Sequence, residues 1–99
     1  VPLVSSEACA PALRDVLTSI SARYNAAESL EDITYDIMQR AVEAVMPHAP
    51  SSARQRVITR FAVYHTDDQM WSWKQGPDPS TLQSLEQAVR DAAALVGFT

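Results

Sequence analysis

The sequence predicts an all-α fold, an up-and-down bundle of four main helices, and three observations support this. Apolar residues recur at helical three- and four-residue spacing in four separate stretches. Residues that start or stop helices stand at the edges of these stretches. The chain has only two glycines, and its six prolines cluster near stretch ends, which argues against a turn-rich β-sandwich. A length of 99 residues is that of one domain, so we expect a leader segment over residues 1–10 and a single helical-bundle domain over 11–99.

The first two helices are defined by proline and serine signals. The first is predicted to begin at Pro11, because proline is well tolerated in the first turn of a helix. The second is predicted to begin after Ser29, which forms a pattern like a capping box with Asp32 three residues later, and Pro47 ends it. The apolar stripes of these helices are Leu13, Val16, Leu17, Ile20 and Tyr24, then Leu30, Ile33, Ile37, Ala41 and Val45.

The third helix leaves an alternative open. Ser51 and Ser52 can start it, and Gln55 completes a second capping-box pattern. However, residues 57–74 contain many β-branched and aromatic side chains, so this region could instead form a β-hairpin. The serine caps and the apolar repeat favour a helix, with a fifth short helix at 67–74.

The last helix has the usual signals at both ends. Asp78 is a good N-cap, Pro79 suits the first helical position, and Gly97 is a typical stop. Short connections predict that consecutive helices pack as antiparallel neighbours. One residue in the middle of each stripe is predicted to lie in the core: Leu17, Ile37, Phe61 and Val89.

Composition disfavours several classes of function. The net charge of −4, with Lys74 as the only lysine, disfavours nucleic-acid binding. No apolar run approaches the roughly 20 residues of a membrane span. Cys9 is the only cysteine, so no intramolecular disulfide can form, and a cytoplasmic location is favoured.

Signals for catalysis, metals or cofactors are weak, and we expect no catalytic residue, metal site or cofactor. His48 and His65 are too far apart for a metal pair on one helix face, and Cys9 lacks a local nucleophile motif. The segment Glu28–Glu31 resembles the Asp-Ser-Leu around the phosphopantetheine serine of acyl carrier proteins, which are small acidic four-helix domains. That resemblance would make Ser29 the modified residue, although the motif's preceding glycine is absent and glutamate replaces aspartate.

Three arginines crowd the first turns of the third predicted helix. Arg54, Arg56 and Arg60 stand where the helix dipole disfavours cations, and the last two form a like-charge pair. Acidic groups are expected to offset them. Antiparallel packing favours Glu43 and Asp36 in the same domain, and the alternative is an acidic partner surface or a phosphate group.

The segment from Met70 to Lys74 is predicted to be the main contact with a partner. It carries Met70, Trp71 and Trp73 within four residues, beside a predicted break and a linker of glycine and proline. Tryptophan is enriched in binding hot spots, so either Trp71 or Trp73 is expected to anchor the contact.

These patterns favour a small protein–protein interaction module, such as an adaptor, a docking domain or the helical end of a larger protein. The expected partner is another protein, or a second copy through self-association. The alternatives are a small helical carrier protein or enzyme, and a self-assembling structural domain.

Overall fold

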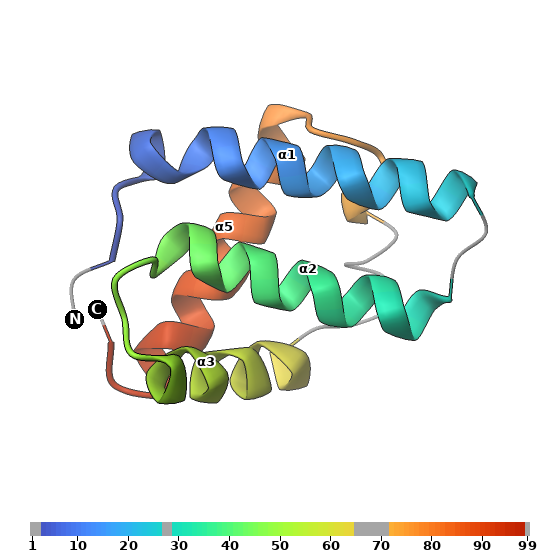
Figure 1. Ribbon diagram of the computed structural model, residues 1–99. Helices are drawn as coiled ribbons and strands as arrows, with labels where there is room; N and C mark the ends of the chain where they lie inside the picture. Colours follow the sequence, from blue (N-terminus) through green and yellow to red (C-terminus); the bar gives the residue numbers. More distant parts are fainter. Residues whose placement is uncertain (1–2, 27–28, 65–71, 99) are drawn as a thin grey trace.

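The computed structural model describes residues 3–26, 29–64 and 72–98 and has four helices and no strand within them (Figure 1). The helices are α1 (Ser6–Asn25), α2 (Leu30–Val45), α3 (Ser51–Tyr64) and α5 (Pro79–Leu95). The first three alternate in direction, as expected, whereas α5 crosses them steeply and contacts each of them. The predicted all-α bundle is therefore confirmed. Among the described residues, no helix is long and apolar enough to cross a membrane.

The first helix begins earlier than predicted. Ser5 is its N-cap, and the Ser5 side chain accepts a hydrogen bond from the backbone N–H of Ala8. The prediction of a start at Pro11 is wrong, because this proline lies inside α1. The expected leader segment is helical from Ser6 onward, and the backbone N–H of Val4 donates to the carbonyl of Val45, at the end of α2, over 2.9 Å.

The other helices begin close to their predicted positions, but the predicted capping hydrogen bonds are not formed. Ser29 and Asp78 occupy the N-cap positions of α2 and α5, yet neither side chain makes a capping hydrogen bond within the described chain. At α3 the helix begins at Ser51, so Ser52 lies inside the first turn and cannot cap it. The capping boxes predicted at Ser29 and Ser52 are therefore not formed.

The alternative of a hairpin is excluded for the part of the segment that the structure describes. Residues 57–64 are helical, and residues 65–71 lie outside the described residues. The chain after them makes a helical turn at Ser72 and Trp73, which ends with the N–H of Gly76 donating to the carbonyl of Trp73. Gly76 has a φ of +108°, a conformation that glycine adopts easily, and this directs the chain toward α5.

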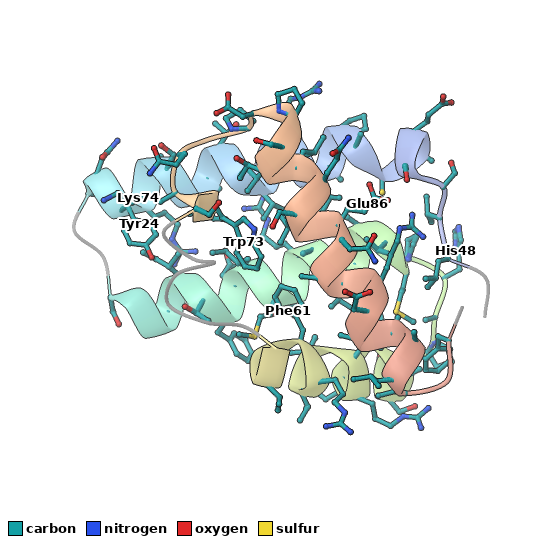
Figure 2. All side chains as sticks on the ribbon, turned by 180° about the vertical axis from the view of Figure 1, so that it is seen from behind. Tyr24, His48, Phe61, Trp73, Lys74 and Glu86 are labelled. Atoms are coloured by element: carbon teal, nitrogen blue, oxygen red, sulfur yellow. The ribbon has the colours of Figure 1, made fainter. Side chains whose placement is uncertain are left out.

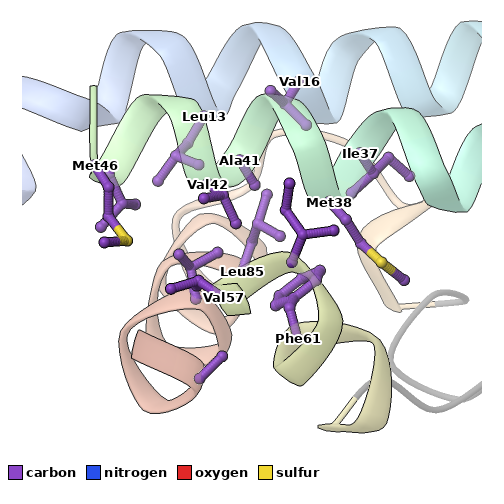
Figure 3. Packing of buried hydrophobic residues seen from close by; sticks show 14 of the residues in the cluster. Leu13, Val16, Ile37, Met38, Ala41, Val42, Met46, Val57, Phe61 and Leu85 are labelled. Carbon is purple, nitrogen blue, oxygen red and sulfur yellow. The ribbon is translucent and has the colours of Figure 1, made fainter. Parts of the chain in front are cut away.

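The core lies between the pair α1 and α2 and the pair α3 and α5 (Figure 3). Each helix contributes its apolar stripe, and Figure 3 shows side chains from all four helices converging. Burial removes these groups from water, which is the main favourable term in folding. The four residues predicted for the core are confirmed as buried: Leu17, Ile37, Phe61 and Val89.

The end of α5 forms a Schellman motif around Gly97. This glycine has a φ of +94°, and its N–H donates to the carbonyl of Ala94 over 3.1 Å. The N–H of Phe98 donates back to the carbonyl of Ala93 over 2.9 Å. The two bonds satisfy carbonyls that a helix end leaves unpaired, and the turn packs Phe98 against the core.

Candidate functional site

The predicted contact segment at 70–74 is only partly on the surface. The Trp73 side chain is fully buried, and its ring lies nearly parallel to that of Phe61, with centroids 5.8 Å apart (Figure 2). Its indole Nε1 donates to Ser84 Oγ over 3.3 Å. Trp73 is thus a core residue, which leaves Trp71 as the remaining candidate of the two tryptophans for the predicted anchor.

Of the other predicted contact residues in that segment, the structure places Lys74 but not Met70 or Trp71. The Lys74 ammonium lies 5.3 Å from the centre of the Tyr24 ring, a cation–π contact that ties the segment to the end of α1. Met70 and Trp71 lie outside the described residues, so their predicted contact role stays a prediction. The second predicted surface, formed by the arginines of α3, lies wholly within the described residues.

Arg54 behaves as expected for a residue paired within the domain. Its Nη1 lies 3.9 Å from Glu43 Oε1 on α2, and its Nη2 donates to Ser51 Oγ over 3.3 Å. The other expected acidic partner, Asp36, is instead paired with Arg23 of α1 at 2.7 Å. The predicted link from α3 to the end of α2 is thus confirmed for one arginine and one acid.

Arg56 and Arg60 do not follow the expectation. Both are exposed, and neither has an acidic partner among the residues that the structure describes. The Arg56 guanidinium instead lies 5.5 Å from the centre of the Phe98 ring. A helix turns by about 100° per residue, so Arg56 points about 200° away from Arg54 and from the acids of α2. Glu43 and Asp36, the acids that the sequence predicted as partners, therefore do not pair with these two arginines.

These two arginines belong to an exposed row along α3, which we call the arginine stripe. It consists of Arg56, Thr59, Arg60 and Val63, whose spacing of three and four residues places them on one helix face. All four are exposed, and Val63 is 70% exposed although it is apolar. Since α3 carries three arginines and no acidic residue, its charge is +3. The stripe is a cationic surface with an apolar residue at one end.

A row of opposite charge follows α2, and we call it the acidic stripe. It consists of Asp32, Tyr35, Asp36 and Gln39, again on one helix face. Tyr35 is 56% exposed, and the Asp36 side chain remains 43% exposed beside Arg23. Sequence reasoning missed this row as a candidate surface. The available signal in the sequence was Tyr35, an aromatic residue that stands at helical spacing among polar residues.

A third polar cluster joins the start of α1 to α5. Glu86 accepts hydrogen bonds from Ser6 Oγ and from Arg90 Nε, the latter at 2.7 Å, and Arg90 also donates to the carbonyl of Val4. Burial alone would raise the pKa of the Glu86 carboxyl, but these hydrogen bonds and the charge of Arg90 outweigh it and hold the pKa below its usual value. Sequence reasoning missed this cluster, because it links residues 80 or more positions apart.

The role of this cluster is structural. A carboxylate with a lowered pKa is a weak base, so Glu86 is poorly suited to activate the Ser6 hydroxyl. Cys9 is buried nearby, and burial followed by the charge of Glu86 raises the pKa of its thiol, which disfavours the reactive thiolate. No group of three metal-ligating side chains occurs within the described residues. The cluster therefore fastens the N-terminal segment to α5.

Comparison with known proteins gives no relative: no protein-family model, curated protein or solved structure matches the chain. The function of the domain therefore has to be inferred from the surfaces of the molecule itself. Trp73 and the Glu86 cluster are occupied by internal contacts. The arginine stripe and the acidic stripe are exposed, and each combines charge with an exposed apolar or aromatic side chain.

Proposed function

We propose that this domain is a protein–protein interaction module that binds its partner through the arginine stripe of α3. The observation that carries the proposal is the state of Arg56 and Arg60. Both are exposed and lack an acidic partner among the described residues, and they stand beside Val63, which is 70% exposed. Arginine is enriched in interface hot spots, where its long apolar stem and its fixed array of donors both contribute.

The charge balance favours an acidic protein segment over a nucleic acid. The chain has 12 acidic residues against 8 basic ones, so a long polyanion would meet a repulsive field beyond α3. At physiological salt, charges further apart than about 8 Å are largely screened. A short segment with a few carboxylates and an apolar residue would contact only the stripe, where Val63 offers it an apolar surface.

The test compares two variants that lose the same charge. Arg56→Gln/Arg60→Gln removes the cations of the stripe, whereas Arg14→Gln/Arg40→Gln removes two cations from α1 and α2. Each domain is immobilised and exposed to an extract of the source cell, and the retained proteins are quantified by mass spectrometry.

The proposal predicts proteins that the wild type and the Arg14/Arg40 variant retain and that the stripe variant loses. Circular dichroism would check that all three domains are folded. Equal retention by the stripe variant and the wild type would contradict the proposal, because the contact would then lie elsewhere on the domain.

A further inference from the structure

We infer that the occupant of the arginine stripe is the acidic stripe of a second copy of this chain, so that the domain assembles with itself. This inference rests on the proposed function, because it assigns a partner to the same surface. Four observations on α2 and α3 support it: their charges, the spacing of those charges, the exposed apolar side chains, and the single ion pair that joins the two helices in the described part of one molecule.

The two helices carry equal and opposite charge. α2 contains four acidic residues and one arginine, which gives −3, whereas α3 contains three arginines and no acid, which gives +3. Within one molecule, Arg54–Glu43 is the only ion pair between these helices in the described part of the chain. Asp36 of α2 is paired with Arg23 of α1, so the stripe charges without an ion pair in the described part of the chain are Asp32, Arg56 and Arg60, and these can attract another molecule.

The two stripes also match position by position. In the acidic stripe the charges stand at Asp32 and Asp36, and in the arginine stripe they stand at Arg56 and Arg60. Both pairs are four residues apart, which is about 6 Å along a helix. When α2 of one copy lies antiparallel along α3 of another, Asp32 can therefore meet Arg60. The exposed part of the Asp36 carboxylate, which also pairs with Arg23, can then meet Arg56.

Apolar exposure supports the same pair of surfaces. Three large hydrophobic side chains are exposed among the described residues: Tyr35, Val63 and Leu95. Tyr35 lies in the acidic stripe and Val63 lies in the arginine stripe. Contact between the stripes would remove both from water, which adds a favourable term that does not depend on salt.

The stripes are different patches of the molecule, so the contact joins unlike surfaces. Such contacts close into rings or continue as open chains of subunits. Exposed ion pairs are individually weak and are screened by salt. The association should therefore be modest, strongest at low ionic strength and dependent on protein concentration.

The experiment uses charge reversal and exchange. Molar mass is measured by sedimentation and light scattering over a concentration series at low salt. The wild type is expected to exceed the monomer mass as concentration rises, and to return toward it at about 0.5 M salt, where the screening length is only a few ångströms. Arg60→Glu and Asp32→Lys should each remain monomeric, because each places like charges against each other. Arg14→Glu, which makes the same charge change on α1, should associate as the wild type does.

Exchanging the charges of the two stripes then tests whether these stripes contact each other. Mixing the Arg60→Glu and Asp32→Lys variants should restore association, because the unchanged acidic stripe of the first can meet the unchanged arginine stripe of the second. The double variant Asp32→Lys/Arg60→Glu should associate with itself, because its two exchanged charges are again opposite. If Asp32→Lys weakens the fold in circular dichroism, Gln39→Lys introduces a cation into the same stripe and replaces it in the exchange.

Two results would overturn the inference. One is a wild type that stays monomeric at every concentration in low salt, and the other is association that Arg60→Glu leaves unchanged. If the wild type is monomeric but Arg56→Gln/Arg60→Gln still loses captured proteins, the inference fails and the proposed function stands. If neither self-association nor capture depends on the stripe, both fail.

Discussion

Replacing Trp73 by alanine should destabilise the domain strongly, because its side chain is fully buried and stacked on Phe61. Truncation of a buried tryptophan typically costs about 3–5 kcal/mol. The lost aromatic stack accounts for roughly 0.5–1.5 kcal/mol, which keeps the expected value in the upper part of that range. In a domain of about 100 residues each kcal/mol lowers Tm by roughly 4–8 °C, so the loss should be at least about 12 °C.

The matched control for this variant is Trp73→Phe. It keeps an aromatic ring beside Phe61 but loses the hydrogen bond from indole Nε1 to Ser84, which is worth about 1 kcal/mol. Urea unfolding followed by circular dichroism would give both free energies of unfolding. The expected order of stability is wild type, Trp73→Phe, Trp73→Ala. A Trp73→Ala domain within about 1 kcal/mol of the wild type would refute the placement of this ring in the core.

Three further variants test other contacts. The pKa of Glu86 is lower in the folded domain than in the unfolded chain, so its stabilisation is present above the unfolded pKa and is lost as pH falls through the folded value. Glu86→Gln should therefore lower the free energy of unfolding at pH 6. It should also reduce the fall in that free energy that the wild type shows on acidification. Urea unfolding at pH 6 and at a pH below the folded pKa of Glu86 would measure both effects. Gly97→Ala should cost about 1 kcal/mol in thermal unfolding, since φ is +94° and only backbone strain opposes the new methyl group. Arg56→Gln/Arg60→Gln should change stability by no more than about 0.5 kcal/mol, because loss of the like-charge pair offsets loss of the cation–π contact between Arg56 and Phe98. A clear loss would show that these arginines support the fold.

The apolar pattern was sufficient to predict the helices and their buried faces. An amphipathic helix shows the same periodicity in sequence and in burial, so Leu17 and Val89 could be placed in the core without a structure. Helix starts were less certain. The sequence pattern predicts Pro11 in the first turn of α1, whereas the cap formed by Ser5 lies ahead of it and the helix accommodates the proline in its second turn.

The candidate site was harder to predict, because it depends on contacts between distant residues. Nothing local shows that Trp73 stacks on Phe61 and bonds to Ser84, since that contact needs α3 and α5 to be in place. The spacing of the arginines did predict which of them share a helix face. It could not show that Arg54 faces α2 whereas Arg56 reaches Phe98, because the packing of α3 against its neighbours decides this.

The central claim is that the arginine stripe of α3 is a contact surface, and its most direct test is the chemical accessibility of its arginines. An arginine-specific dicarbonyl reagent, with modification mapped by mass spectrometry, would compare the dilute domain with the assembled one. The assembled state is either the concentrated domain or the domain bound to a captured partner. We predict that Arg56 and Arg60 react readily in the dilute domain and become protected on assembly, whereas Arg14 on α1 stays reactive in both. Arg56 and Arg60 remaining as reactive as Arg14 in the assembled state would contradict the claim.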